Sequence, residues 1–199
     1  TSILESMIKS IPIEGLGFLA PVNYAHAENE DFVDLLAQSK NIFLNSFSNQ
    51  LNETSQALKE WLSKDLLESD GNILFAIYEN NGNLVGFVGF SDCINEYQNF
   101  KIDYLVKGRK DAAQGIMSAA TNSIIEWARI TFNVETFNLR VTSDNECALK
   151  FFEKNGFREV KQIAIKKEVS GEVTTSNEST TSHADKYLIE MIYEDRRVV

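Results

Sequence analysis

The segment from Val106 to Met117 carries residue types suited to binding a phosphate group. A predicted strand ends in this segment, a short loop follows, and a helix begins. The first turn of a helix has about four backbone N–H groups without intrahelical partners, and these attract anions. The segment therefore predicts a phosphate site, although an ordinary strand-to-helix loop with exposed bases would have the same composition. Its small and basic residues are Ala112, Ala113, Gly115, Arg109 and Lys110.

A second segment, Asn145 to Phe157, reads N-x-x-A-x-x-F-F-E-K-x-G-F and predicts an amphipathic helix that leads into a strand. Ser143 and Glu146 have the spacing of a capping box, which predicts Ser143 as the cap of this helix. Asn155 and Gly156 predict its end, because glycine adopts the left-handed conformation beyond a last helical turn. Core packing by itself accounts for the two Phe residues in the helix.

The elements that must position these segments alternate between strands and helices. Apolar periodicity predicts helices over Glu30–Phe43 and Thr54–Leu67. The turn Asn80–Asn83 lies between two apolar runs, Ile73–Tyr78 and Leu84–Phe90, and so predicts a hairpin. This order predicts an α/β or α+β fold with a mixed sheet. The other predicted elements are strands at Leu16–Asn23, Phe100–Val106, Phe137–Val141, Phe157–Val169 and Lys186–Glu194, and a helix at Gly115–Ile130.

Composition excludes several classes of function. The chain has 199 residues, 43% of them apolar, which suits one domain with a substantial core. Its 19 basic and 29 acidic residues give a net charge of −10, so nucleic acid is not an expected partner. Apolar runs stay shorter than the roughly 18–20 residues of a membrane span. Two distant cysteines without a secretory signal predict a cytoplasmic protein, and two histidines make a metal site unexpected.

The loop and the later helix together resemble the GNAT superfamily of acyl-CoA-dependent N-acetyltransferases. That family has a pyrophosphate loop of the form R/Q-x-x-G-x-G/A between a strand and a helix, and a later helix of the form N-x-x-A-x-x-F/L-Y/F-x-K-x-G-F. Asn145 to Phe157 matches the second pattern closely, and the order of elements agrees over nearly the whole chain. Trp61 and Leu62 lie in a part that resembles the branch containing ribosomal-protein N-terminal and amino-sugar acetyltransferases.

The resemblance implies a fold as well as an activity. We expect one domain over residues 1–199, with its core at about residues 13–195 and a mobile Ser- and Thr-rich hairpin tip at 170–182. The implied sheet is mixed and mostly antiparallel, has six to seven strands and is flanked by about four helices.

The implied reaction moves an acetyl group from acetyl-CoA, the acyl donor, to a primary amine. Backbone groups near the end of the strand at Phe100–Val106 would hold the pantetheine arm, and an N–H near Leu105 would polarise the thioester carbonyl. Asn145 would hydrogen-bond the pantetheine, and Phe152 would pack beside its thiol end. The donor-binding residues implied in this way are Leu105, Val106, Arg109, Lys110, Ala112, Ala113, Gln114, Gly115, Ile116, Met117, Asn145 and Phe152.

The match departs from the family pattern at the loop and at the helix. Ala112 and Met117 replace the usual Arg or Gln and the second Gly. Phe152 replaces a Tyr that protonates the leaving thiolate in many members, and Tyr104 is the best remaining hydroxyl. Asp103 and Asp92 are candidates for the base. Solvated surface acids and a packed aromatic ring would account for the same three side chains.

Several functions remain open at this level. Within the acetyltransferase class, the sequence favours a small amine, such as a nucleotide-linked amino sugar, over a protein N-terminus. A catalytically inactive acyl-CoA-binding module is a second possibility, because the usual Tyr and second Gly are missing. A nucleotide-binding protein is weaker, because the sequence lacks a P-loop motif. We expect a monomer or a homodimer that binds no nucleic acid, membrane or metal.

Overall fold

The computed structural model describes residues 9–43, 55–94, 98–170, 173–178 and 186–195, and these fold into two units. The first unit comprises the described residues of 1–39 and 53–137. The second comprises those of 40–52 and 138–199.

Five antiparallel strands form the sheet of the first unit, in the spatial order β1-β2-β3-β4-β5. The β3–β4 hairpin pairs Ile73 with Phe90 and Ile77 with Gly86, and it turns through Asn80–Asn83 as predicted. Gly82 supplies the left-handed φ of +86° that this turn requires. The strands are β1 (Ile11–Ile13), β2 (Gly17–Pro21), β3 (Ile73–Glu79), β4 (Leu84–Ser91) and β5 (Asn99–Lys107).

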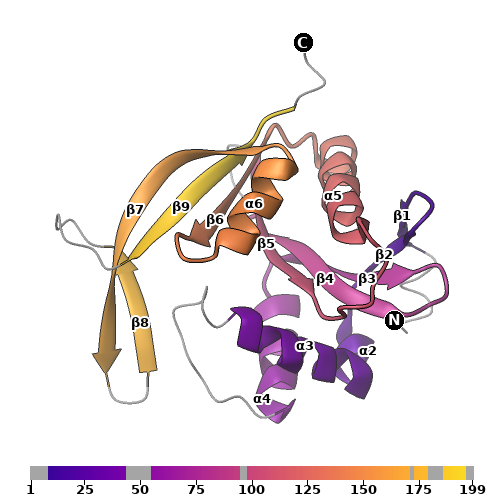
Figure 1. The fold of residues 1–199 in the computed structure, drawn as a ribbon. Helices are drawn as coiled ribbons and strands as arrows, with labels where there is room; N and C mark the ends of the chain where they lie inside the picture. Colours follow the sequence, from indigo (N-terminus) through magenta and orange to yellow (C-terminus); the bar gives the residue numbers. More distant parts are fainter. Residues whose placement is uncertain (1–8, 44–54, 95–97, 171–172, 179–185, 196–199) are drawn as a thin grey trace. The chain divides into compact units, whose positions relative to one another are not determined.

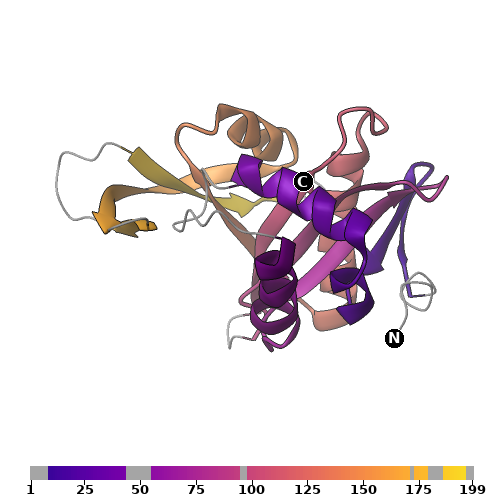
Figure 2. The same ribbon diagram turned by 90° about the horizontal axis from the view of Figure 1, so that it is seen from below.

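Helices cover both faces of this sheet. Figures 1 and 2 show α5 on one face and α2, α3 and α4 on the other. Trp127 of α5 packs edge-on against Phe75 of β3, with ring centroids 5.0 Å apart, and Phe32 of α3 packs near Phe87 of β4 at 6.3 Å. The elements are α2 (Tyr24–Ala27), α3 (Glu30–Phe43), α4 (Ser55–Glu60), the π-helix η1 (Trp61–Leu67) and α5 (Ile116–Phe132).

The second unit contains antiparallel strands in the order β6-β9-β7-β8. Helix α6 packs on β7, where the ring of Phe152 meets that of Phe157 at 5.4 Å. Phe152 is buried, so the second aromatic residue of the N-x-x-A motif belongs to the core of this unit. The elements are β6 (Thr136–Thr142), α6 (Glu146–Lys154), β7 (Phe157–Ser170), β8 (Val173–Glu178) and β9 (Lys186–Tyr193).

The predicted fold class is confirmed: strands and helices are mixed, and neighbouring strands within each unit run antiparallel. Two short strands, β1 and β8, were not predicted, because runs of three and six residues carry little periodicity. Strand β8 lies within the Ser- and Thr-rich stretch at 170–182, of which 171–172 and 179–182 lie outside the described residues. The mobility of that stretch stays a prediction.

The predicted capping box of α6 is wrong by two residues. Asn145 is the cap, and its side-chain oxygen accepts the N–H of Ala148 at 3.1 Å. Ser143 instead pairs with β9: its hydroxyl accepts the N–H of Tyr187 at 3.2 Å, and its own N–H donates to the Tyr187 carbonyl. Pairing with β9 therefore keeps Ser143 from capping the helix, and Asn145, two residues later, is the cap instead.

Candidate active site

A β-bulge interrupts the pairing of β4 with β5. Phe87 pairs with Val106 and Gly89 pairs with Asp103, so Tyr104 and Leu105 together lie opposite the single residue Val88. Tyr104 has a φ of +59°, a left-handed conformation that a bulky residue adopts only where its surroundings impose it. A bulge disrupts the ladder and redirects backbone groups. This bulge lies where the family resemblance implies a contact with the thioester.

Asp103 lies at the edge of this bulge and is held by three donors. Its carboxylate accepts the Ser91 hydroxyl at 3.2 Å and lies 3.1 Å from the Lys101 ammonium. It also accepts the backbone N–H of Tyr104 at 3.1 Å. An ionised carboxylate has about four acceptor positions, so this arrangement leaves little capacity unused. Its side chain is 21% exposed, and so Asp103 still reaches solvent.

Tyr104 combines an aromatic contact with a perturbed hydroxyl. Its ring packs edge-on against Trp61 of η1, with centroids 6.0 Å apart. Burial raises the pKa of Tyr104 to about 12, and the negative charges of Asp103 and Asp92 act in the same direction. The hydroxyl is therefore protonated throughout the neutral range and is able to donate a hydrogen bond.

Asp92 follows the last residue of β4 and differs from Asp103 in its surroundings. It is exposed and has a left-handed φ of +56°. Its charge contributes to the raised pKa of Tyr104 and, after burial, to the raised pKa of about 12 at Cys93. The structure thus brings the three predicted catalytic residues, Asp92, Asp103 and Tyr104, into one electrostatic cluster.

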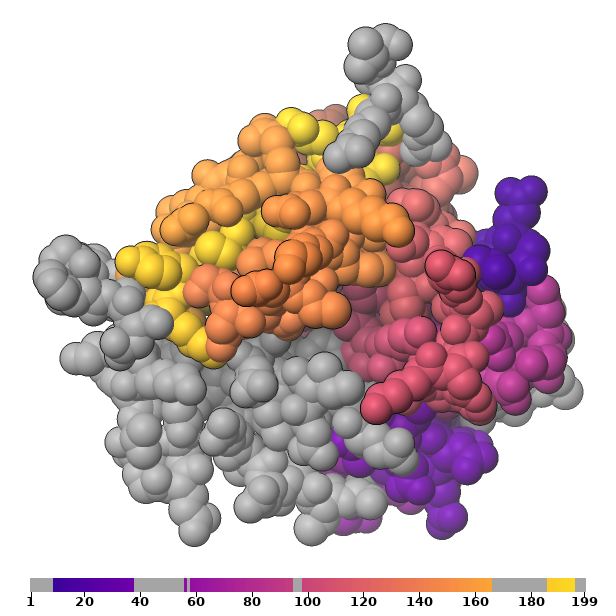
Figure 3. Space-filling model, viewed as in Figure 1, coloured from indigo at the N-terminus to yellow at the C-terminus, as the bar shows by residue number. Residues whose placement is uncertain are grey.

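The loop from Gly108 to Gly115 ends at an open helix start. Gly115 precedes α5 with a φ of +86° and contributes no side-chain cap, and a Cβ built there would meet no atom within 4 Å. Within the described residues, no hydrogen bond uses the N–H groups of Gln114, Gly115, Met117 or Ser118. Figure 3 shows the loop at the surface of the first unit. Uncommitted N–H groups at a helix start fit a pyrophosphate.

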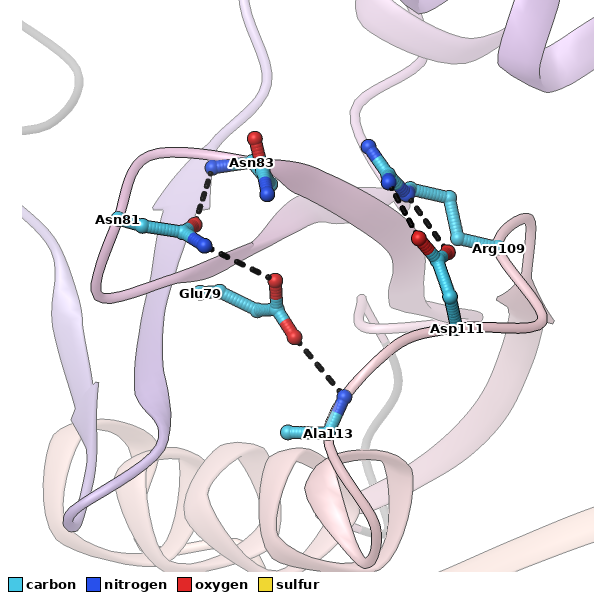
Figure 4. Close-up of polar contacts among 6 residues, drawn as sticks. All are labelled: Glu79, Asn81, Asn83, Arg109, Asp111 and Ala113. Carbon is cyan, nitrogen blue, oxygen red and sulfur yellow. Dashed lines mark hydrogen bonds and ion pairs between the residues drawn. The ribbon is translucent and has the colours of Figure 1, made fainter.

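Two of the predicted amide donors are already committed within the protein. The N–H of Ala113 donates to the Glu79 carboxylate at 2.8 Å (Figure 4), and the N–H of Ile116 donates to the Ala113 carbonyl at 3.2 Å. Fewer backbone N–H groups between Ala112 and Met117 are therefore available to an anion than the sequence indicates. The available N–H group of Ser118 lies one residue beyond this predicted range, within α5.

The two basic residues of the loop have different surroundings: Arg109 forms an ion pair, and Lys110 faces solvent. The Arg109 guanidinium binds the Asp111 carboxylate through two hydrogen bonds, from Nε at 3.0 Å and from a terminal nitrogen at 2.7 Å (Figure 4). That hydrogen bond lowers the pKa of Asp111 and raises that of Arg109. Lys110 is exposed. Both bases remain at the surface, within the segment that the sequence assigns to a phosphate.

Leu105 and Val106 lie in β5 of the first unit, whereas Asn145, before α6, and Phe152, in α6, belong to the second. In that unit Asn145 caps the helix and Phe152 packs against Phe151 and Phe157. Their contact with the same donor molecule stays a prediction, as do the individual roles of all the candidate residues. The described residues contain no group of three or more His, Cys, Asp or Glu placed to hold a metal ion.

Sequence reasoning missed Glu79, Ser91 and Trp61 as neighbours of the candidate site. Glu79 reaches a loop 34 residues later, and Ser91 reaches Asp103 across two strands. The hairpin pairing of β4 with β5 would have brought Ser91 next to Lys101, since the two are register partners. No local pattern indicates the contact of Glu79.

Comparison with known proteins identifies the class. The family model described as the acetyltransferase (GNAT) domain matches residues 22–158, and the chain belongs to this family. The prediction of an N-acetyltransferase is thereby confirmed. No helix among the residues that the structure describes is long and apolar enough to cross a membrane.

Individual relatives agree with this assignment. An N-acetyltransferase 9-like protein of Caenorhabditis briggsae is 25% identical over 138 residues, which cover 64% of this chain and 69% of that protein. Spermidine N-acetyltransferase from Vibrio cholerae, solved with CoA and spermine, is 15% identical with a TM-score of 0.65, over 87% of this chain and 92% of that one. The ribosomal L7/L12 alpha-N-protein acetyltransferase is 13% identical with a TM-score of 0.71, over 94% of both chains. The two structures share the fold.

Proposed function

We propose that this N-acetyltransferase moves the acetyl group of acetyl-CoA to the primary amine of a small cationic molecule. One observation carries the proposal: β5 leads from a bulge beside two carboxylates into a loop that ends at an open helix start. The bulge supplies the acyl-transfer end and the helix start supplies the phosphate end. The two ends are joined by one strand and one loop of the same unit.

The donor is held chiefly by backbone groups. The N–H groups of Gln114, Gly115, Met117 and Ser118 surround the position of the pyrophosphate, with Arg109 and Lys110 adding local positive charge. Such local donors overcome the net charge of −10, which by itself repels an anionic donor. At the bulge, the N–H of Leu105 polarises the thioester carbonyl, because Asp103 already accepts the N–H of Tyr104.

The acceptor amine arrives mostly as an ammonium ion, since alkyl amines have a pKa near 10.4. Asp103 and Asp92 attract this cation, and Asp103 takes up its proton before attack on the carbonyl. Tyr104 hydrogen-bonds the departing sulfur without giving up its proton, because a thiolate with a pKa of about 8.5 is a weaker base than a tyrosinate with a pKa of about 12. The ammonium formed on attack or water then supplies the proton of the thiol.

A small cationic amine suits this cluster better than a nucleotide-linked sugar does. The exposed Asp92 carboxylate and the edge-on pair of Trp61 and Tyr104 favour a cation, whereas phosphates on the acceptor would meet Asp92 unfavourably. The charge of Asp103 is balanced by its ion pair with Lys101. Two structural neighbours act on spermidine and on a ribosomal protein, according to their names. Spermidine is itself a small polyamine.

Thiol release from acetyl-CoA tests the proposal directly. The panel contains a polyamine, an amino sugar, a nucleotide-linked amino sugar and a peptide with a free N-terminus. We expect CoA binding by calorimetry and the highest kcat/KM with the polyamine. A CoA-binding protein that acetylates none of the four would contradict the proposed transfer, and preference for the peptide would replace the proposed acceptor class.

The variant Asp103→Asn tests the proton acceptor. We expect kcat to fall at least tenfold while the Kd of CoA stays within twofold, because the carboxylate acts on the amine. Asp92→Asn makes the same charge change at the exposed carboxylate nearby and should lower kcat less than Asp103→Asn does. Full turnover by both variants from pH 6 to 9 would show that water removes the proton.

A further inference from the structure

The Glu79 carboxylate connects the end of β3 to the loop before α5. Its Oε1 accepts the N–H of Ala113 at 2.8 Å, across 34 residues of sequence (Figure 4). A hydrogen bond from an amide to an ionised acceptor is shorter and stronger than a neutral one. This contact is therefore a specific link between the hairpin and the loop.

Glu79 is itself fixed by the β3–β4 turn. Its N–H donates to the carbonyl of Asn83 at 3.0 Å, and its carbonyl accepts the N–H of Gly82 at 2.9 Å. The second carboxylate oxygen lies 3.5 Å from the Asn81 amide nitrogen, and the Asn81 oxygen accepts the N–H of Asn83 at 2.9 Å (Figure 4). The carboxylate thus extends from a turn that has internal hydrogen bonds of its own.

Both backbone polar groups of Ala113 form hydrogen bonds within the protein. Its N–H is bound by Glu79, while its carbonyl accepts the N–H of Ile116 at 3.2 Å. These two bonds orient the peptide groups on either side of Ala113, immediately before Gln114 and Gly115. The uncommitted N–H groups of the helix start follow directly.

The other end of the loop is held by the same hairpin. The carbonyl of Val85 in β4 accepts the N–H groups of Gly108 and Arg109 at 2.8 and 3.2 Å. Leu35 of α3 packs so closely on Gly108 that a Cβ there would lie 2.3 Å from its Cδ1. Both ends of the loop are therefore attached to the β3–β4 hairpin, the second end by Glu79.

A carboxylate is an unexpected group beside an anion site, because its charge repels phosphate. Its hydrogen bond and its charge have opposite effects on the affinity for an anion. A substitution that keeps the acceptor oxygen but removes the charge separates the two effects.

We infer that Glu79 is a positioning residue of the pyrophosphate loop, which it holds through Ala113 in the conformation that leaves the N–H groups of residues 114–118 available to the donor. This inference rests on the proposed function. Glu79 does not touch the reacting atoms. Its loss is expected to change donor affinity and not the chemical step.

Three variants test this role: Glu79→Ala, Glu79→Gln and the control Glu14→Ala, which removes an exposed carboxylate from the same unit. Glu79→Ala should raise the Kd of CoA and the KM of acetyl-CoA at least fivefold and leave kcat within twofold. Glu79→Gln should stay within twofold of the wild type, because its amide oxygen accepts the same N–H. Turnover of S-acetylpantetheine, which lacks the pyrophosphate, should be equal in all variants.

Hydrogen exchange of the Ala113 amide in the free protein supplies an independent measurement. Exchange should be at least fivefold faster in Glu79→Ala than in the wild type and unchanged in Glu14→Ala. Unchanged exchange, or CoA binding by Glu79→Ala as tight as in the wild type, would overturn the inference. A wild-type protein that neither binds CoA nor releases thiol would refute the proposed function, and the exchange result would still decide whether Glu79 fixes the loop.

Discussion

Helices α5 and α6 each follow a strand through a loop, and their first turns differ. Helix α6 begins after Asn145, whose side chain accepts the N–H of Ala148, and it has the acidic Glu146 in its first turn. Helix α5 begins after Gly115, which has no side chain to offer, and its first turn has no acidic residue. We call the start of α6 closed, because the Asn145 side chain binds one of its N–H groups, and the start of α5 open, because no side chain caps it.

The starts of α2 and α3 resemble that of α6. Asn23 accepts an N–H at the start of α2, and Asn29 accepts the N–H of Phe32 in α3 at 2.9 Å. A capping Asn typically contributes about 1 kcal/mol of stability. Gly115 provides no such contribution at the start of α5. The uncapped start of α5 therefore contrasts with the Asn-capped starts of α2, α3 and α6.

The largest expected effect concerns the closed start of α2, which includes a titratable group. Burial lowers the pKa of His26 from 6.5 to about 4, partly offset by its hydrogen bond to the Asn23 backbone. The unfolded chain binds the proton near pH 6.5 and the folded one only near pH 4. Protonation of His26 should therefore lower the free energy of unfolding by about 3 kcal/mol as the pH falls from 6.5 to 4.

The variant His26→Gln isolates this effect. Gln at the same capping-box position still accepts the Asn23 N–H but has no charge change. Urea unfolding at pH 7 and pH 4.5 should show a smaller loss of stability in the variant than in the wild type. Equal losses would assign the acid sensitivity to other groups.

Closing the open start should weaken donor binding. In Gly115→Glu, the new carboxylate repels the pyrophosphate, and we expect the Kd of CoA to rise at least tenfold, or about 1.4 kcal/mol. Gly115→Ala imposes the same left-handed strain of about 1 kcal/mol without the charge. Calorimetry should give a change below threefold for Gly115→Ala, and unchanged affinity in Gly115→Glu would remove this loop from the site.

Opening the closed start of α6 should cost stability. Asn145→Ala removes the cap, and we expect a loss of about 1 kcal/mol in urea unfolding. Asn145→Asp keeps an accepting oxygen and should restore that stability while it removes the amide donor. If Asn145 also binds the pantetheine, the Kd of CoA should rise at least threefold in Asn145→Asp, and an unchanged Kd would limit Asn145 to capping.

The smallest effect concerns the ion pair beside the open start. Asp111→Asn removes a negative charge and releases the Arg109 guanidinium, so the Kd of CoA should fall two- to threefold at low salt. The difference should shrink in 0.5 M salt, and Asp34→Asn, on the exposed side of α3, should have no such effect. Weaker binding by Asp111→Asn would mean that Asp111 orients Arg109 for the phosphate.

Much of the local structure followed from the sequence. The periodicity of α3, the Asn- and Gly-containing turn of the β3–β4 hairpin and the small residues before α5 each depend on neighbours within a few positions. The structure matches the predicted bounds of α3 and places the other predicted elements within about two residues. The predicted strand Leu16–Asn23, for example, is β2 at Gly17–Pro21. The family motif on α6 was equally local.

Tertiary structure alone decided how the site is completed. The bulge at Tyr104 depends on the register of β5 against β4, and the proximity of Asp92 and Asp103 to the Tyr104 hydroxyl depends on the same register. The contact of Glu79 with Ala113 joins residues 34 positions apart. Helix and turn preferences are set by interactions within a few residues, which the sequence displays directly. Register, bulges and side chain-to-loop contacts are set by long-range packing, which one sequence does not display.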